Sequence, residues 1–367
     1  MFPKMESNLE IHVPCYNEQG NILKFLKSLQ AQTYKSFRVI VHDNGSTDKT
    51  PEICRVFCKG DPRFELDSIP INTHVINQLI RIKFSPRSDF IGQLSVNDFI
   101  SDDYLLELMR VITQDESIGL VYSHGYLHNL KDGVDRDPGD HCSFDTRGMS
   151  PIEGVNEVMA RYTHAFPLWG IYRRRVLERL RPMQFVYGGD HVFVAEVALY
   201  SKIAKVARKV NWRTGGTSTD EAVMKHNTLI QLEEYARGIH PTSFFYGAAQ
   251  NMPFLNMIWG HIEMFSFAHT DEATKYTLIH SAAAILNSRF HPFIDQEVGG
   301  FLGQCEQIIA HYGVTDLSGY DKTVLLTWFK KLSAELYKIA QVPGLSKFAE
   351  RLKAVMTGLN GASLRCF

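Results

Sequence analysis

The sequence lacks any apolar run long enough to cross a membrane as a helix. The best candidate, residues 244–262, is interrupted by Gln250, Asn251, Pro253 and Asn256, whereas a spanning helix needs about 20 predominantly apolar residues. The first residues likewise lack the apolar core of a secretory signal. We therefore expect a protein that is soluble or peripheral to a membrane.

Paired cysteines and an excess of charge of one sign are also missing. The 6 cysteines are scattered without a CxxC pair, which argues against a disulfide framework and favours reduced thiols in a cytoplasmic protein. The 39 basic and 40 acidic side chains leave a formal net charge of −1. A chain this close to neutral has no overall field that draws it to nucleic acid, so we expect no nucleic-acid partner.

What the sequence does contain is a composition suited to packed cores and an alternation of strand and helix patterns. Its 367 residues are 44% hydrophobic and 22% charged, which is enough for two domains. Apolar runs at Leu9–Val13 and Phe37–Val41 flank an amphipathic segment at Asn21–Gln32. Strand, helix and strand in this order are typical of a βαβ unit, which requires parallel strands. We therefore predict an α/β fold with an open, mainly parallel sheet flanked by helices.

The pattern changes towards the C-terminus, which suggests a second domain. Further strands are predicted at 90–96, 118–123 and 205–212, and further helices at 50–58, 102–113, 152–162 and 191–200. Beyond residue 221 only helical patterns follow, at 222–239, 273–288, 300–312 and 322–340. We therefore expect an α/β domain at residues 1–225 and an α-helical C-terminal domain at residues 226–367.

Polar and aromatic side chains gather where the predicted strands end, at Pro14–Glu18, His42–Ser46 and Ser95–Asp98. In an open α/β sheet, ligands bind outside the carboxyl ends of the strands. A stacking aromatic ring, a carboxylate that accepts a ring N–H and an acid that holds a divalent cation together fit a nucleotide diphosphate. Each of these residues also has an ordinary structural alternative, as a packed rim aromatic, a turn former or a helix cap.

The order of these motifs resembles the opening of the family 2 glycosyltransferases, which are nucleotide-sugar enzymes with the GT-A fold. The resemblance rests on PCYNE at 14–18, QTY at 32–34 and DNGSTD at 43–48. The later segments LSVND at 94–98, GIYRRRVL at 170–177 and GGDH at 188–191 are similar to the family's metal motif, Arg-Arg helix and catalytic-base motif. Beyond residue 220 the resemblance gives nothing.

For the donor, the resemblance implies a role for each residue of the first two motifs. Pro14 and Tyr16 would line the nucleobase, Asp43 would bond the base ring, and Glu18 would lie near the donor. A UDP-sugar is the favoured donor.

For the diphosphate, the resemblance implies that Asn97 and Asp98 lie beside it and that Asp98 holds Mg²⁺ or Mn²⁺. A divalent ion there stabilises the charge that grows on the leaving phosphates. The family commonly has acids where this chain has Ser95 and Asn97. A weaker metal site, or one completed by a histidine such as His226, is the alternative.

The catalytic base is expected at Asp190, because it follows two glycines and opens an apolar helix that would hold it rigidly. An ordinary helix N-cap is the alternative for this residue. The neighbouring His191 is a second candidate for the base.

Three other features leave two interpretations open each. Arg173–Arg175 face phosphates or form a solvated helix face, and Trp169 stacks on a sugar or packs in the core. The glycines and hydroxyls of Thr214–Thr219 are typical of a loop that closes on the donor, or of an ordinary loop.

Together these features predict an inverting glycosyltransferase of polysaccharide biosynthesis. It would move a sugar from a nucleotide diphosphate donor to a hydroxyl of a glycan, lipid-linked or protein acceptor. Because the metal motif has lost acids, a catalytically impaired GT-A module that acts as a nucleotide-binding or scaffold protein is the alternative.

The C-terminal tail is basic and amphipathic. Residues 320–367 hold eight basic side chains against three acidic ones, and apolar residues repeat at helical spacing between 324 and 339. Such a segment is typical of an interfacial helix that contacts an anionic membrane, or of a helix that packs on its own domain with a basic outer face. The first interpretation predicts peripheral membrane contact through 320–367.

Overall fold

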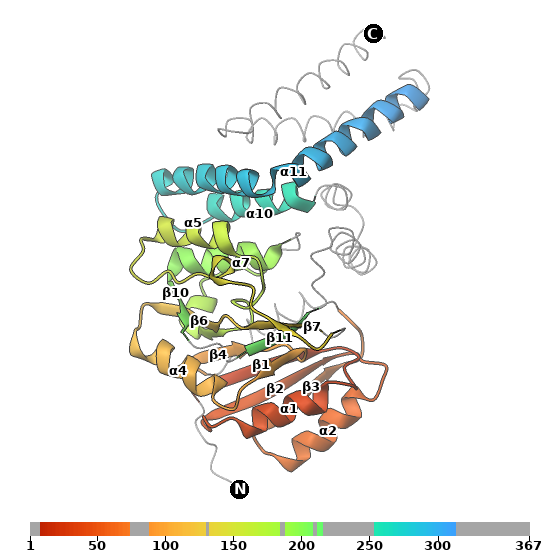
Figure 1. Cartoon of the computed structure of the whole chain (residues 1–367), viewed down its shortest axis with the longest axis vertical. Helices are drawn as coiled ribbons and strands as arrows, with labels where there is room; N and C mark the ends of the chain where they lie inside the picture. The colour runs from red at the N-terminus through yellow and green to blue at the C-terminus, as the bar shows by residue number, and fades with distance from the viewer. Residues whose placement is uncertain are drawn as a thin grey trace. The chain divides into compact units, whose positions relative to one another are not determined.

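The structure is a computed structural model, and it describes residues 8–73, 88–129, 132–183, 188–207, 211–215 and 253–312. The chain divides into two compact units, of which the first holds the described residues up to 183 and from 189 to 215, and the second holds 253–312. Figure 1 draws the elements of both units. The predicted domain boundary at residues 225 and 226 lies outside the described residues and stays a prediction.

The first unit is built on a seven-stranded sheet with the order β10-β6-β9-β4-β1-β2-β3. Its strands are β1 (Leu9–Cys15), β2 (Phe37–Asn44), β3 (Phe64–Ile69), β4 (Phe90–Gln93), β6 (Ile118–Ser123), β9 (Ile171–Arg173) and β10 (Lys202–Val206). β9 runs antiparallel to β4 and β6, whereas β1 is parallel to β2 and β4, β2 to β3, and β6 to β10. The predicted α/β fold with an open, mainly parallel sheet is confirmed.

A second, four-stranded sheet corrects two of the predicted strands. Its order is β5-β11-β7-β8, with β5 (Asp98–Ile100), β7 (Tyr126–Asn129), β8 (Asp135–Arg136) and β11 (Asn211–Gly215). The strand predicted at 90–96 ends at Gln93, because Asp98 N–H bonds Ser95 O (3.1 Å) in a turn that leads into β5. The strand predicted at 205–212 is wrong as a single element, because its ends belong to β10 and β11 in different sheets.

Five described helices of the first unit lie close to the predicted ones, and the short α6 is additional. They are α1 (Ile22–Ala31), α2 (Thr50–Gly60), α4 (Tyr104–Gln114), α5 (Pro151–Arg161), α6 (Arg174–Leu177) and α7 (Gly189–Tyr200). In α1, the buried side chains Ile22, Phe25, Leu26 and Leu29 recur at helical spacing and form the face that packs in the core. α5 begins with a capping box, in which Ser150 and Glu153 bond each other's backbone N–H.

The two faces of β1 and β2 differ in chemistry, because side chains alternate along a strand. Ile11 and Val13 of β1 and Val39 and Val41 of β2 belong to the apolar core with α1, and Figure 1 shows α1 and α2 side by side against this part of the sheet. The intervening residues of β1 include Glu10 and His12, and both are completely buried. Buried polar side chains therefore form a layer on this face of β1 and β2. Its residues include His42, near the end of β2.

The second unit consists of two described helices, α10 (Pro253–Ser266) and α11 (Glu272–Tyr312). The helices predicted at 273–288 and 300–312 are parts of this single 41-residue helix, which continues through Pro292. Pro292 has no N–H to give to Ser288 O, and the Nδ1 of His291 lies 3.2 Å from that oxygen and donates instead. The helices predicted at 222–239 and 322–340 and the basic tail lie outside the described residues.

Within the ranges that the structure describes, no helix is both long and apolar enough to span a membrane.

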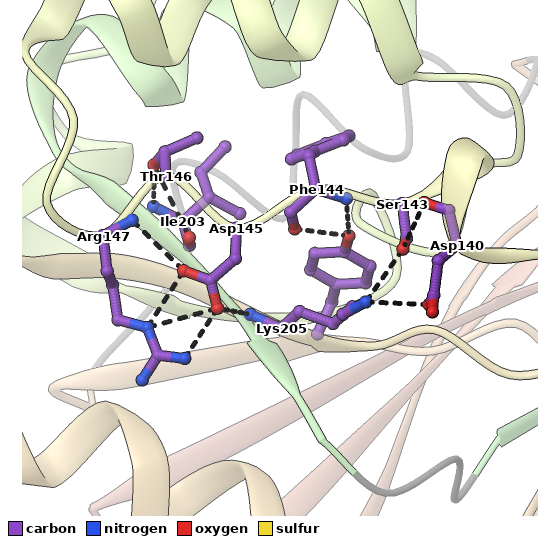
Figure 2. A network of polar contacts seen from close by, with 9 residues as sticks. Asp140, Ser143, Phe144, Asp145, Thr146, Arg147, Ile203 and Lys205 are labelled. Carbon is purple, nitrogen blue, oxygen red and sulfur yellow. Dashed lines mark hydrogen bonds and ion pairs between the residues drawn. The ribbon is translucent and has the colours of Figure 1, made fainter.

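The segment from Asp140 to Arg147 is bonded along the free edge of β10, as Figure 2 shows. Thr146 exchanges two 2.8 Å hydrogen bonds with Ile203, and Lys205 N–H bonds the carboxylate of Asp145 (3.1 Å). The ammonium of Lys205 reaches Asp140 (3.1 Å) and Ser143 (3.0 Å). This segment therefore covers a sheet edge that would otherwise be open to pairing.

Tyr122 of β6 fastens the same segment, because its hydroxyl donates to Phe144 O (2.8 Å) and accepts from Phe144 N–H (2.9 Å). We expect Tyr122→Phe to lower the free energy of unfolding by about 1–3 kcal/mol, since both buried backbone groups lose their partner. Chemical denaturation measures the loss, with Tyr276→Phe at an exposed position as the control. An equal stability of the two variants would contradict this role.

Candidate functional site

The ends of β1 and β2 lie side by side and bring the first group of predicted residues together. In the parallel register, Pro14 pairs with His42 and Cys15 pairs with Asp43. Tyr16 follows directly, with 42% of its surface exposed. Pro14, Tyr16 and Asp43 therefore share one edge of the sheet, as expected from the strand ends.

Asp43 is buried, with 1% of its surface exposed, yet both carboxylate oxygens have partners. Oδ1 accepts from Ser46 N–H (3.2 Å), and Oδ2 accepts from the hydroxyl of Ser68 on β3 (2.7 Å). An ionised carboxylate has about four lone-pair sites, so it can still accept a bond from a ligand. Ser68 was missed at the sequence level, because β3 itself was not predicted.

The loops after β1 and β2 are tied to each other by side chains that read as simple turn formers in the sequence. Asn17 has a positive φ of 54°, and its Oδ1 accepts from Thr47 N–H (2.8 Å) while its own N–H donates to Ser46 Oγ (2.9 Å). Glu18 N–H donates to Thr50 Oγ1 (2.8 Å). These bonds hold the loop that follows Tyr16 and the loop that follows β2 in a fixed relation.

The predicted metal motif lies beside the first loop. Asn97 Nδ2 donates to Glu18 Oε1 (3.2 Å), while Asn21 Nδ2 lies 3.2 Å from both Glu18 Oε2 and Asn97 Oδ1. Asp98 begins β5 and is buried, with 3% of its surface exposed. Glu18, Asn21 and Asn97 thus join the loop after β1 to the segment after β4, and Asp98 follows Asn97 directly.

This donor set fits a metal that is bound largely by its substrate. No group of three or more His, Cys, Asp or Glu side chains capable of holding a metal occurs among the described residues. Mg²⁺ is commonly held by one or two carboxylates together with substrate phosphates and water. Asp98 could supply one carboxylate, and Glu18, which Asn97 contacts, could supply a second. The alternative ligand His226 lies outside the described residues.

Asp190 lies in the first turn of α7, directly after Gly188 and Gly189. Its Oδ2 accepts a 2.8 Å hydrogen bond from the hydroxyl of Tyr162, which is 5% exposed. The ring of Tyr162 packs edge-on against His191, with centroids 5.1 Å apart. Tyr162 thus orients the carboxylate, and the sequence carried no signal for it, since it is 28 residues away. The role of Asp190 as base stays a prediction.

The guanidinium groups of Arg173–Arg175 have partners within the fold. Arg173 lies on strand β9 rather than on a helix, and it donates to Ile118 O (3.0 Å). Arg174 lies 3.4 Å from Asp89, and Arg175 lies 3.6 Å from Glu116. These contacts favour the structural interpretation of the three arginines over binding of phosphate.

The remaining candidates are placed only in part. Trp169 accepts a 3.2 Å bond from the Tyr104 hydroxyl through its carbonyl oxygen, which leaves both interpretations of its indole open. Thr214 and Gly215 end β11, and residues 216–219 lie outside the described residues.

Comparison with known proteins identifies the family of this domain. The model of the family described as Glycosyl transferase family 2 matches residues 10–181. Residues 10–181 therefore belong to that family, and the resemblance inferred from the motifs is confirmed.

Two curated relatives are glycosyltransferases by name. Glycosyltransferase GlyA of Streptococcus pneumoniae serotype 4 is 26% identical over 191 residues, which are 48% of this chain and 26% of that protein. GalNAc(5)-diNAcBac-PP-undecaprenol beta-1,3-glucosyltransferase of Campylobacter jejuni is 25% identical over 193 residues, 50% of this chain and 57% of that protein. The match thus spans less than two thirds of either relative.

Among solved structures, the chain is similar to residues 1–349 of S. aureus TarS, with a TM-score of 0.54 and 14% identity over 95% of this chain and 82% of that one. The same protein in complex with UDP-GlcNAc gives a TM-score of 0.51 and 14% identity, with 80% of each chain covered. At this identity the likeness concerns the fold, and it agrees with the predicted GT-A-like architecture.

Proposed function

We propose that this chain is an inverting glycosyltransferase that moves a sugar from a UDP-sugar to a hydroxyl acceptor. The observation that carries the proposal is the buried carboxylate of Asp43 at the end of β2, which pairs with Cys15, the residue directly before the partly exposed Tyr16. A buried acid that keeps an unfilled acceptor site next to a stacking surface suits a planar base with a ring N–H. The membership of residues 10–181 in the family supports the same activity.

The choice of UDP has two supports. Asp43 is an acceptor, and its ionised form suits the ring N–H of uracil. The structural neighbour TarS is described in complex with UDP-GlcNAc. Pro14 would form the floor of the base site next to Tyr16, and Glu18 would lie towards the diphosphate.

At the diphosphate, Asp98 and Glu18 would hold Mg²⁺ or Mn²⁺ together with the phosphate oxygens. The ion supplies Lewis-acid stabilisation of the charge on the leaving phosphates. Asn97 would position Glu18 through their 3.2 Å hydrogen bond, so that the carboxylate is set before the donor arrives.

At the acceptor, Asp190 would take the proton of the attacking hydroxyl. Direct displacement at the anomeric carbon needs one positioned carboxylate on the face opposite the nucleotide. The bond from Tyr162 holds one oxygen of Asp190 and so fixes the direction in which the carboxylate points.

The acceptor itself is proposed as a glycan, a lipid-linked sugar or a protein in polysaccharide biosynthesis. Two relatives carry names that specify lipids, a processive diacylglycerol beta-glycosyltransferase of Mycoplasma pneumoniae and the C. jejuni enzyme with an undecaprenol substrate. Contact of residues 320–367 with an anionic membrane would suit such acceptors.

The loss of acids at Ser95 and Asn97 favours a second candidate, an impaired GT-A module that binds nucleotide without turnover. Release of free UDP from a panel of UDP-sugars, measured with and without acceptor extracts, separates the two. Binding of UDP without any release would support the module, and release would support the enzyme.

We expect Asp43→Asn to weaken UDP binding by about 1.5–3 kcal/mol, because a charge-assisted bond to the base becomes a neutral one. Asparagine keeps the size of the side chain and an oxygen for Ser46 N–H. Calorimetric titration with UDP measures the change, and Ser68→Ala should give a smaller loss. A folded Asp43→Asn protein with unchanged affinity would remove Asp43 from the site.

We expect activity to require Mg²⁺ or Mn²⁺ and Asp98→Asn to abolish it. Asn97→Asp removes the amide that bonds Glu18, but it should keep or raise activity and tighten Mn²⁺ binding in the presence of UDP, because the bound ion then lies between the carboxylates and takes over the positioning of Glu18. Paramagnetic resonance of Mn²⁺ follows binding independently of turnover. Full turnover in excess EDTA would contradict the metal site.

We expect Asp190→Asn to lower kcat by about 10²–10⁴ with little effect on UDP binding, as removal of a general base does. Tyr162→Phe should lower kcat by a smaller factor, since it only frees the carboxylate to rotate. Steady-state kinetics with calorimetry in parallel separates the two constants. A lost donor affinity with unchanged kcat would make Asp190 a binding residue.

A further inference from the structure

A continuous chain of hydrogen bonds between ionisable side chains crosses β1, β2 and β3 inside the first unit. Glu10 Oε1 lies 2.8 Å from His12 Nε2, and His12 Nδ1 lies 2.8 Å from His42 Nε2. His42 Nδ1 lies 2.9 Å from Asp67 Oδ2. Glu10 and His12 are completely buried and His42 is 3% exposed, so water does not screen the contacts of His12 with Glu10 and His42, whereas the Asp67 side chain at the end of the chain is 38% exposed.

The two imidazole rings are arranged so that each ring nitrogen faces a partner. The rings are inclined by only 6°, with centroids 5.1 Å apart, and their nearest nitrogens point at each other. Both outer nitrogens face carboxylates, of Glu10 on one side and Asp67 on the other.

The number of protons in the chain follows from these contacts. Each of the three contacts needs one proton between its two atoms, because two lone pairs at 2.8–2.9 Å repel each other. Two neutral imidazoles carry only two N–H protons. The three contacts can all be hydrogen bonds only when the chain holds a third proton, whether it resides on His12, His42 or the Asp67 carboxylate.

The charges around the pair balance when this third proton is present. Arg38 of β2 donates to Glu10 Oε2, and burial, which acts to raise the pKa of the Glu10 carboxyl, is outweighed by the bonds from His12 and Arg38, so that its pKa is lowered. With Arg38 positive and Glu10 and Asp67 negative, one extra proton makes these three side chains and the two imidazoles neutral as a group. A neutral cluster is the form that a buried site favours.

The other groups that neighbouring strands place around the pair are one amide and one carboxylate. β4 contributes the uncharged Gln93 at the level of His12, and β3 contributes Glu65 two residues before Asp67 and opposite Ile40. Among the described residues of these strands, Arg38 is thus the cation and Glu10 and Asp67 the anions in direct contact with the chain.

We propose that His12 and His42 hold one proton more than two neutral imidazoles, and that this proton makes them positioning residues for the donor site by clamping the ends of β2 and β3 together. The second half of this inference rests on the proposed function. None of His12, His42 and Asp67 is among the proposed donor contacts, so their effect passes through the strands.

The histidine pair is linked to the donor site through the next pair of residues on β2 and β3. His42 pairs with Asp67 and the next pair is Asp43 with Ser68. Because successive side chains point to opposite faces, the histidine clamp holds one face and the 2.7 Å bond from Ser68 to Asp43 holds the other. When the third proton leaves, two lone pairs face each other in one of the three contacts and repel. The pairing of β2 with β3 then loosens at the next pair, Asp43 and Ser68.

The sign of the pH effect follows directly. The clamped form has the proton bound, so donor affinity is fully present at low pH and falls as the pH rises past the point of release. One released proton gives a fall of about tenfold per pH unit beyond that point.

The proton count is measured by nuclear magnetic resonance of the full chain labelled with ¹⁵N-histidine, with His42→Gln used for assignment. At neutral pH we expect three protonated ring nitrogens among the four of His12 and His42, or two together with a protonated Asp67, and a coupling between the two rings across their shared proton. Two neutral rings beside an ionised Asp67 would overturn the proposal, whatever the function of the chain.

The effect on the donor site is measured with Asp67→Asn. This substitution keeps the size of the side chain and removes the need for the third proton. The amide that this substitution introduces can donate to His42 Nδ1, so two neutral imidazoles complete every bond and the cluster is again neutral. Calorimetric titration with UDP between pH 6 and 10 should show a steeper alkaline fall in the unsubstituted protein than in Asp67→Asn. Any titration of UDP itself is common to both proteins and cancels in the comparison.

His128→Gln is the matched control, because His128 also bonds an aspartate, Asp135 at 2.7 Å, but on the partly exposed second sheet. It should retain the alkaline fall. The same fall in the unchanged chain and in Asp67→Asn would overturn the positioning role. If none of the proteins binds UDP, the proposed donor fails and with it the positioning role, while the resonance experiment still decides the proton count.

Discussion

The parallel pairing of β1 with β2 is the constraint on which the rest of the first unit depends. It places the carboxyl ends of two strands at one edge, 28 residues apart in sequence but adjacent in register, as for Cys15 and Asp43. The donor part of the site is attached to that edge through the loop bonds of Asn17 and the polar contacts of Glu18. A parallel pair needs a long crossover, and α1 supplies it while burying one face of both strands.

The other face of the β1/β2 pair carries buried polar side chains. Burying them lowers the stability of the fold unless each polar group has a hydrogen-bond partner. Glu10, His12 and His42 satisfy one another, with Arg38 and Asp67 at the two ends. An apolar layer would stabilise the fold as well or better, so the polar layer is explained more readily by what it does for the strand ends than by stability. The fold and the site therefore share these strands at different faces.

Features that depend on local pattern were predictable from the sequence, and features that depend on partners far along the chain were not. The strands of the βαβ unit and the amphipathic helix α1 have strong periodicity, and Tyr16, Asp43 and Asp98 follow from their place after strands. Ser68 was missed because it lies in a weakly patterned strand and its bonding partner, Asp43, is 25 residues away in the sequence. Tyr162 was missed because it follows a helix and its partner, Asp190, is 28 residues away. β9 lies where the motif resemblance predicts a helix, since three residues that pair with β4 and β6 carry no periodicity of their own.

In α11, the imidazole of His291 makes the hydrogen bond to Ser288 O that Pro292 cannot make. This replacement affects how the helix can bend. A helix of 41 residues is about 60 Å long, and such a rod is normally stiff because each turn is bonded to the next by the backbone. At Pro292 one of those bonds is made by the side chain of His291 instead. Next to Pro292, bending is therefore opposed at Ser288 O by a side-chain hydrogen bond from an exposed ring and not by a backbone hydrogen bond.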